Sequence, residues 1–363
     1  MGKETLHEAD QTGAVMDISS IREGIHWQAD HAEKAGAGGT ARVIRGVLAL
    51  LDGKTATGRR VAAWQGAVIK DAMPLRIHGG LHNLVLTGED RRLEEVYARR
   101  LTDQASVDAI VCDLVEKYDH RLLPWLDGPP QTNEAGRSSS FIAGLAWLAG
   151  RVVPRFEMLE LGASAGINTM MDRSFYDLGG VHFGPADSPM HIVPEWRGDP
   201  QSAQVFEITS IRGCDIAPVD LSDPDAALRL KSYVWPEAHE RMARIYAAAQ
   251  LAALSPPDVV RQDAAEFVED ALSRSQMAGT TRVLFHSIVW QYIPADQQKR
   301  IEQVMGNAAA RASDECPLAW MQLETNRETF RHELSLRYWP GGEKPVILAN
   351  AHPHGAWVEW LGD

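Results

Sequence analysis

The sequence predicts an α/β protein in which a mostly parallel β-sheet follows an N-terminal helical region. Residues 1–150 carry apolar residues at helical spacing and no alternating strand pattern. From Val152 onward, short apolar runs alternate with helical segments, which is typical of parallel strands joined by crossover helices. The last two runs are joined by Trp339-Pro-Gly-Gly342, a hairpin-like turn that predicts an antiparallel terminal strand. We therefore expect a helical domain over residues 1–150 and a sheet domain over residues 151–363.

The helical region is predicted from apolar residues that recur every three or four positions. Glycine and proline clusters break this pattern and mark the expected helix ends. The periodic groups are Ile21, Ile25 and Gln28; Val43, Val47 and Leu50; Leu93, Val96 and Leu101; and Ile110, Leu114 and Val115. The breaks are Ala35–Gly39, Asp52-Gly53, Gly79-Gly80 and Asp127–Pro130.

The strands of the sheet domain are predicted from short apolar runs bounded by turn residues. These runs cover residues 156–161, 205–212, 258–261, 282–289, 317–323, 333–338 and 345–350.

Composition and charge limit the classes of partner. The net charge of −13 and the lack of a basic run argue against nucleic acid and anionic membranes, so we expect a small-molecule substrate. The N-terminus has no apolar signal-peptide stretch, and the longest apolar stretch, Phe141–Pro154, is too short to cross a bilayer. Cys112, Cys214 and Cys316 lack metal-ligand spacing, which favours buried thiols in a reducing compartment. We expect a cytoplasmic protein, and a homodimer is one option for its oligomeric state.

Residues 156–166 form an apolar strand followed by a glycine loop that enters a helix. The pattern Glu160-x-Gly162-x-x-x-Gly166 resembles the loop that holds S-adenosylmethionine in Rossmann-like methyltransferases. The pattern Gly162-x-Ser164-x-Gly166 equally resembles the nucleophile elbow of α/β-hydrolases. Both need glycines, because the backbone turns tightly and approaches a ligand. The loop alone leaves both interpretations open.

A second acid, Asp215, ends the run Ile211-Arg-Gly-Cys-Asp-Ile-Ala-Pro218. This run resembles the second strand of methyltransferases, where a carboxylate accepts hydrogen bonds from the ribose hydroxyls. The alternative is a surface turn residue. In a βαβ unit without an insertion, this acid follows the glycines by roughly 20 residues, and Asp215 lies much further along the chain. We therefore expect an inserted hairpin or flap at residues 176–201.

A third acid, Asp263, follows the short run at residues 258–261 and resembles the residue that meets the adenine amino group. It is equally a candidate N-cap, because Glu266 stands three residues later. Together with the loop, these acids give the expected S-adenosylmethionine contacts: Glu160, Gly162, Ala163, Ser164, Gly166, Asn168, Asp215 and Asp263.

The acceptor side of the site is expected where the run at residues 282–289 ends, because donor and acceptor meet there in methyltransferase folds. His286 and Tyr292 are candidates there, and a buried structural histidine is the alternative for His286. Glu324 follows the next run and His352 the last one, and either is a candidate base.

Two further polar clusters stand out. Gln131–Ser138 precedes an apolar helix and suits either a ligand-facing loop or a capped linker. His352 and His354 share a face if the strand continues, but no cysteine or carboxylate stands at matching spacing, so we predict no metal.

The hydrolase interpretation has support in the order Ser164, acid, His352 or His354, and in His78-Gly-Gly80, which resembles an oxyanion loop. It requires several strands before the elbow, and residues 1–150 look helical. The methyltransferase interpretation collects four consecutive matches in the expected order, and we favour it. A non-catalytic or different Rossmann-type nucleotide-binding protein is the remaining alternative.

Several motifs together resemble a bacterial family of uncharacterised proteins, domain of unknown function 2332. The resemblance covers nearly the whole chain and implies a fold similar to S-adenosylmethionine-dependent methyltransferases. It implies no substrate or reaction. The motifs are Gln131-Thr-Asn-Glu-x-Gly-Arg137, Leu159-Glu-Leu-Gly-Ala-Ser-Ala-Gly-x-Asn168, Gly213-Cys-Asp-x-x-Pro218, Val234-Trp-Pro236, Phe285-His-Ser-x-Val-Trp-Gln-Tyr292 and His352-Pro-His-Gly355.

Overall fold

The computed structural model describes residues 18–199 and 204–363. Two parts of the sequence predictions lie outside these ranges: the N-terminal segment, in which no signal peptide is predicted, and residues 200 and 201 of the expected insertion. The chain forms two compact units. The first comprises residues up to 132 together with 223–243, and the second comprises residues 133–222 and 244–363.

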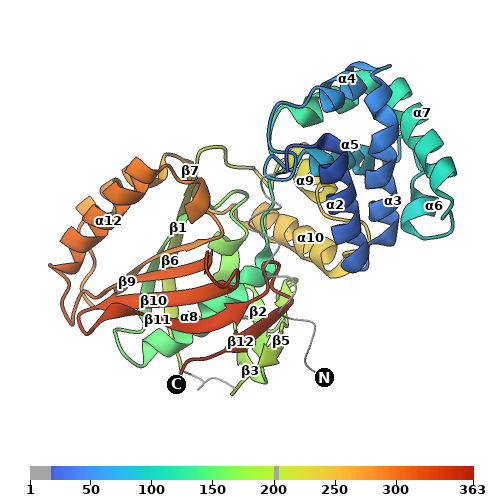
Figure 1. Cartoon of the computed structure of the whole chain (residues 1–363). Helices are drawn as coiled ribbons and strands as arrows, with labels where there is room; N and C mark the ends of the chain where they lie inside the picture. The colour runs from blue at the N-terminus through green and yellow to red at the C-terminus, as the bar shows by residue number, and fades with distance from the viewer. Residues whose placement is uncertain (1–17, 200–203) are drawn as a thin grey trace. The chain divides into compact units, whose positions relative to one another are not determined.

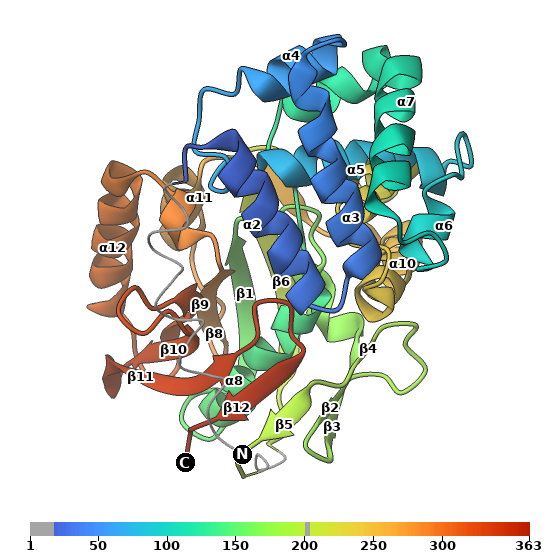
Figure 2. The same cartoon turned by 45° about the vertical axis from the view of Figure 1, so that its right-hand side comes forward.

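The described part of the first unit is helical throughout, as the apolar spacing predicts (Figure 2). Most of the periodic positions lie in its core, with Ile25, Val43 and Val96 all fully buried. The helices are α2 (Ile21–Lys34), α3 (Gly38–Gly46), η1 (Val47–Asp52), α4 (Ala56–Ala62), α5 (Met73–Leu86), α6 (Glu94–Tyr97), α7 (Gln104–Leu122), η2 (Leu123–Leu126) and α9 (Pro224–Ser232).

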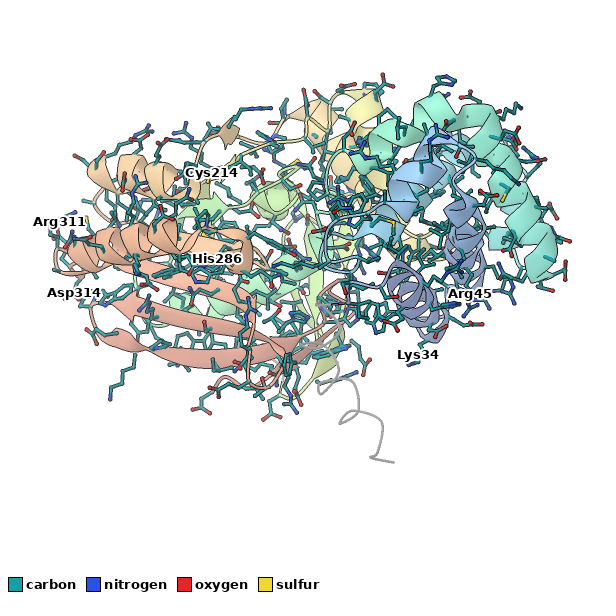
Figure 3. The ribbon with its side chains drawn as sticks, turned by 45° about the horizontal axis from the view of Figure 1, so that its top comes forward. Lys34, Arg45, Cys214, His286, Arg311 and Asp314 are labelled. Atoms are coloured by element: carbon teal, nitrogen blue, oxygen red, sulfur yellow. The ribbon has the colours of Figure 1, made fainter. Side chains whose placement is uncertain are left out.

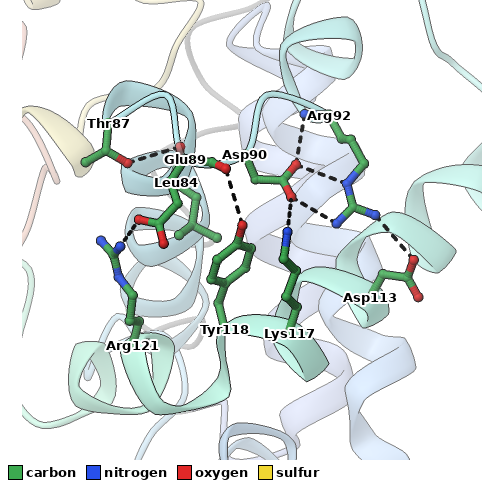
Figure 4. A network of polar contacts seen from close by, with 9 residues as sticks. All are labelled: Leu84, Thr87, Glu89, Asp90, Arg92, Asp113, Lys117, Tyr118 and Arg121. Atoms are coloured by element: carbon green, nitrogen blue, oxygen red, sulfur yellow. Dashed lines mark hydrogen bonds and ion pairs between the residues drawn. The ribbon is translucent and has the colours of Figure 1, made fainter.

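Polar contacts hold the loop after α5 against α7 (Figure 4). The Asp90 carboxylate lies 3.0 Å from Arg92 Nε and 3.7 Å from Lys117 Nζ. The Tyr118 hydroxyl donates to the Glu89 carbonyl at 3.2 Å. These bonds add to the burial of Leu93, which lies at the end of the same loop.

One predicted break is wrong. Gly79 and Gly80 lie within the continuous helix α5, so the His78-Gly-Gly80 segment forms no oxyanion loop. A Cβ atom on Gly79 would lie 2.7 Å from the Tyr233 ring, and one on Gly80 would lie 2.9 Å from Leu122 and Trp125. Close packing of neighbouring side chains, and not a turn, accounts for the two glycines.

The second unit contains a nine-stranded sheet that is mostly parallel (Figure 1). All seven predicted runs form strands, and β10 and β11, which the turn at residues 340–341 joins, are antiparallel as expected. Strand β10 is also antiparallel to β9. The strands, in sheet order, are β5 (Glu195–Arg197), β12 (Trp357–Trp360), β11 (Gly342–Ala351), β10 (His332–Trp339), β9 (Leu318–Thr325), β8 (Thr281–Ser287), β1 (Arg155–Leu161), β6 (Glu207–Asp215) and β7 (Val259–Arg261).

Five neighbouring strands, β7-β6-β1-β8-β9, are parallel to one another. The chain moves outward from β1 to β6 and β7 and then crosses to β8 and β9 on the other side of β1. Progress through the sheet therefore reverses between β1 and β8.

Helices cover both faces of this sheet (Figure 1). Helix α8 (Ser138–Ala149) packs on one face, where Phe141 meets Phe285 with ring centroids 4.9 Å apart. Helices α11 (Ala264–Ser273) and α12 (Ala295–Ala309) cover the other face and enclose Leu159 and Leu284. The boundary between the two units falls within α10 (His239–Leu254).

The segment after β1 supplies the expected insertion. It forms a three-stranded sheet of β2 (Phe175–Leu178), β3 (Val181–Phe183) and β4 (His191–Ile192). Strand β5 follows and extends the large sheet by pairing with β12. The sequence patterns do not predict these short strands or β12.

Helix α8 belongs to the second compact unit, although it lies within the predicted domain of residues 1–150. It contacts β9, β10 and β11 because it is apolar nearly all round and is buried against the sheet. The division into domains stays a prediction.

All three cysteines are free, and only Cys214 is fully buried. Across residues 18–199 and 204–363, no helix combines the length and the apolar character that a membrane crossing requires.

Candidate functional site

The predicted site residues lie at the carboxyl ends of the five parallel strands. Glu160 is next to last in β1, Asp215 ends β6, and His286 is next to last in β8. Asp263 stands two residues past β7, and Glu324 is next to last in β9. Residues from five segments of the chain thus meet at one edge, beside the point where the strand order reverses. This is where ligands bind in open α/β sheets.

The glycine loop turns through left-handed backbone conformations. The φ values are 66° at Gly162, 52° at Ser164 and 70° at Gly166. A Cβ atom on Gly162 would lie 2.3 Å from the side chain of Val289, and one on Gly166 would lie 2.7 Å from Pro257. Both glycines are therefore required by protein packing as well as by the turn.

The backbone N–H groups of the loop are occupied by protein acceptors. Ala163 donates to the Cys214 carbonyl at 2.9 Å, and Gly166 donates to the Ala163 carbonyl at 2.8 Å. Ser164 donates to Asp215 Oδ2 at 2.9 Å, and Ile167 donates to Asn133 Oδ1 at 2.8 Å. A phosphate group bound at a glycine loop needs these N–H groups for itself. These four N–H groups of the loop are therefore not free to bind a phosphate group.

The helix expected after the loop is only the 3₁₀ helix η4 (Asn168–Arg173), with non-helical backbone at Met170. This part of the prediction is wrong. Helix η4 is followed directly by Ser174 in extended conformation and by β2, so the insertion takes the place of a full crossover helix.

Three buried polar atoms beside the loop have no hydrogen-bond partner among the described residues: Glu160 Oε2, Ser164 Oγ and Asn168 Oδ1. Glu160 and Asn168 are each 1 % exposed, and Asn168 Nδ2 donates to Glu160 Oε1 at 3.4 Å. Unsatisfied buried polar atoms are costly and call for an explanation. A ligand with N–H donors would satisfy all three.

Burial raises the pKa of the Glu160 carboxyl to about 8, and the charge of Asp215 adds to the effect. The hydrogen bond from Asn168 and the charge of Arg137 act in the opposite direction on this pKa. Glu160 therefore holds a proton near neutral pH unless a positive group comes close.

Asp215 and Asp263 both bind backbone N–H groups. Asp215 Oδ2 accepts from Ser164, and Oδ1 accepts from Ala217 at 2.8 Å. Asp263 Oδ1 accepts from Ala265 and Glu266 at the start of α11, so the expected N-cap is present. A carboxylate oxygen has two lone pairs, so both acids keep acceptor capacity for a ligand.

His286, which is labelled in Figure 3, pairs with Glu324 near the end of the neighbouring strand β9. The Trp320 indole N–H donates to His286 Nε2 at 3.1 Å, so the ring proton lies on Nδ1, which donates to Glu324 Oε1 at 2.6 Å. His286 is fully buried and stacks on Trp290 with centroids 5.1 Å apart. With both ring nitrogens engaged, His286 is arranged to orient Glu324.

Glu324 also holds the loop that follows β8. Its Oε1 accepts the backbone N–H groups of Val289 at 3.1 Å and Trp290 at 3.2 Å. This loop contains Ile288 with a φ of 51° and carries Val289 against Gly162. Tyr292 ends the short helix η5 (Trp290–Tyr292) and is 69 % exposed. The Glu324 carboxylate thus bonds to His286 and also holds the loop whose Val289 side chain packs against Gly162.

The two polar clusters pack together. Gly136 and Gly355 are in backbone contact, since a Cβ atom on Gly355 would lie 2.3 Å from the Gly136 carbonyl carbon. Arg137 Nε donates to the Pro353 carbonyl at 2.8 Å and Nη1 to the Ser287 carbonyl at 3.4 Å. His352 Nδ1 accepts the backbone N–H of His354 at 3.1 Å. Because Nδ1 acts as an acceptor, the proton of a neutral His352 ring lies on Nε2.

The sequence analysis places Asn133 and Arg137 in a polar cluster but gives neither a role. Asn133 is 5 % exposed and holds the Ile167 N–H, and Arg137 bonds to the end of β8 and acts electrostatically on Glu160. Their position in a polar run before an apolar helix was the only sequence signal. Within the described ranges, no three His, Cys, Asp or Glu side chains gather into a group that could hold a metal ion.

Comparison with curated proteins finds no match to this sequence. A family model described as "Uncharacterized protein conserved in bacteria (DUF2332)" matches residues 22–360. The match spans the helical region, the glycine loop and the final histidine segment, and the chain belongs to the DUF2332 family.

Proposed function

We propose that this protein is an S-adenosylmethionine-dependent methyltransferase that acts on a small molecule. The observation that carries the proposal is the set of three unsatisfied buried polar atoms, Glu160 Oε2, Ser164 Oγ and Asn168 Oδ1, beside the glycine loop. S-adenosylmethionine has an ammonium group that can donate to such atoms, and an acidic partner suits its charge.

The order of the parallel strands supports a Rossmann-like fold for this unit. The order β7-β6-β1-β8-β9 equals 3-2-1-4-5 when the five strands are counted along the chain. In such a fold, the acid near the end of the first strand would face the methionine part of the cofactor. The acid at the end of the second strand would face the ribose, and the acid just past the third would face the adenine. Glu160, Asp215 and Asp263 hold these positions.

The occupied loop amides favour this ligand over a nucleotide di- or triphosphate. Ala163, Ser164, Gly166 and Ile167 already donate to protein acceptors. S-adenosylmethionine carries no phosphate and needs none of these donors. This observation weighs against a different Rossmann-type nucleotide-binding protein.

The hydrolase alternative receives little support. A positive φ at Ser164 is compatible with a nucleophile elbow, but among the described residues none is hydrogen-bonded to the Ser164 hydroxyl, so no base is bonded to it. The described chain before β1 contains helices and no strand.

The cofactor would supply an activated methyl group on sulfur. The protein's task is then to orient the acceptor and to remove its proton. Glu324 is the strongest base candidate, because three donors fix its Oε1 while its side chain stays 21 % exposed. His286 acts as a positioning residue for Glu324.

Calorimetric titration of the full chain with S-adenosylmethionine and S-adenosylhomocysteine tests the proposal, with ATP and NAD⁺ as phosphate-bearing controls. We expect both sulfur compounds to bind and both controls to fail. Binding of ATP or NAD⁺ without binding of either sulfur compound would overturn the proposal.

A further inference from the structure

The helical unit contains a cavity of about 600 Å³. It lies among α5, α6 and the segment that precedes α10. Its wall includes His82, Tyr97 and Glu237, with Glu94 and Arg99 also contributing. All of these residues belong to one compact unit. The volume falls within the roughly 300–1,000 Å³ typical of small-molecule sites.

The buried part of the wall is polar, although the surrounding core is apolar. His82 is 2 % exposed and Tyr97 is 8 % exposed. Their rings lie 5.7 Å apart, and His78 completes a cluster of three rings. His82 Nδ1 lies 3.1 Å from the Ser232 carbonyl oxygen, which can only accept, so the proton of a neutral ring lies on Nδ1. Aromatic faces and acceptor atoms are the groups that recognise cations.

The fixed charge on this wall is negative. Glu237 accepts the Thr40 N–H at 3.0 Å through Oε1 and the Thr40 hydroxyl at 2.7 Å through Oε2, so its carboxylate is held in place. Burial lowers the pKa of His82 to about 4, while the Ser232 carbonyl, the Glu237 charge and the Val234 carbonyl all act to raise it. Burial alone disfavours a positive charge on the His82 ring, whereas the neighbouring carbonyl groups and the Glu237 carboxylate favour one.

We infer that this cavity is a second ligand site, which binds a small organic cation with its ammonium group against Glu237, His82 and Tyr97. An anion would meet the Glu237 carboxylate, whereas Glu94, which also lines the cavity, is paired with Arg91 at 3.7 Å. The Arg99 guanidinium, which would favour an anion, is exposed and donates to the Gly36 carbonyl. The inference is independent of the methyltransferase proposal, since no residue is shared between the two sites.

Three probes of similar size and different charge test the inference: 2-phenylethylammonium, 2-phenylethanol and phenylacetate, each titrated calorimetrically into the full chain. We expect the ammonium compound to bind about tenfold more tightly than the other two, the scale of one charge-assisted hydrogen bond. Equal binding of the alcohol or the carboxylate, or no saturable binding of any probe, would overturn the inference.

Two variants and a control test whether the ammonium compound binds in this cavity. Glu237→Gln should weaken ammonium binding about tenfold. Glu95→Gln should not weaken it, because Glu95 lies on α6 but pairs with Arg100 and does not line the cavity. Since Glu237→Gln also disturbs the Thr40 contact, Ala98→Trp provides a second test: Ala98 lines the cavity but is exposed, so the indole fills the space without touching the core. Undiminished ammonium binding in both Glu237→Gln and Ala98→Trp would refute the site.

Discussion

The Asp215 carboxylate accepts the backbone N–H of Ser164 at 2.9 Å and so joins the end of β6 to the glycine loop that follows β1. The loop holds a positive φ at Ser164, and this bond is one of the contacts that keep it there. An acid expected to bind a cofactor thus also shapes the loop expected to bind the same cofactor. This double role determines how its replacement must be tested.

Replacing Asp215 with Ala should weaken S-adenosylhomocysteine binding by about 1.5–3 kcal/mol, the range for hydrogen bonds to a charged group. Asp215→Asn keeps an oxygen for the Ser164 N–H and should lose less. The matched control is Glu207→Ala, at the opposite end of β6, where Glu207 is exposed and pairs with Arg155. Calorimetry measures all three, and an Asp215→Ala protein that binds like the wild type would show that the second-strand assignment is wrong.

Ser164→Ala should retain cofactor binding but weaken it by about 1.5–3 kcal/mol, because Ser164 Oγ is one of the three atoms proposed to accept from the ammonium group. In the part of the chain that the structure describes, the Ser164 hydroxyl makes no hydrogen bond, so no base is bonded to it that could activate it. A fluorophosphonate probe should therefore not label the wild-type protein. Labelling that disappears in Ser164→Ala would favour the hydrolase alternative.

Glu160→Gln should change the pH dependence of stability. The folded pKa of about 8 lies above the ordinary 4.5, so the folded chain retains a proton that the unfolded chain releases. The free energy of unfolding should therefore fall as pH rises from about 4.5 through about 8, by at most about 1.4 kcal/mol per pH unit.

Glutamine does not titrate, so Glu160→Gln should lose this decline and exceed the wild type in stability at pH 8.5. Urea unfolding at pH 5, 7 and 8.5 measures the effect, with Glu207→Gln as the exposed control. Parallel curves for wild type and Glu160→Gln would mean that Glu160 is ionised in the folded protein.

Glu324→Ala should lower the free energy of unfolding by about 3 kcal/mol or more, because His286 Nδ1–H and the N–H groups of Val289 and Trp290 lose their acceptor. Glu324→Gln keeps an oxygen at Oε1 and should cost much less. Glu302→Ala, at an exposed position of α12, is the control and should stay within about 0.5 kcal/mol of the wild type. Equal losses in the Ala and Gln variants would show that the three bonds to Oε1 are not what stabilises this edge.

The sequence by itself determined the parts of this protein that rest on local patterns. Seven strands were predicted because apolar runs bounded by turn residues must be buried in a sheet, and the turn after Trp339 predicted the antiparallel strand. The N-cap at Asp263 was predicted because its partners lie two and three residues away. Each of these features depends on residues close together in the chain.

Only the tertiary structure decided what depends on distant partners. Gly79 and Gly80 read as a helix break, but the Tyr233 and Trp125 rings occupy the space beside them in a continuous helix. His286 and Glu324 stand 38 positions apart, and their bond was not predicted. The acceptors for the loop N–H groups come from Asp215 and Asn133. Which acceptor satisfies a given donor depends on the folded arrangement, because hydrogen bonds require atoms within about 3 Å of one another whatever their separation in sequence.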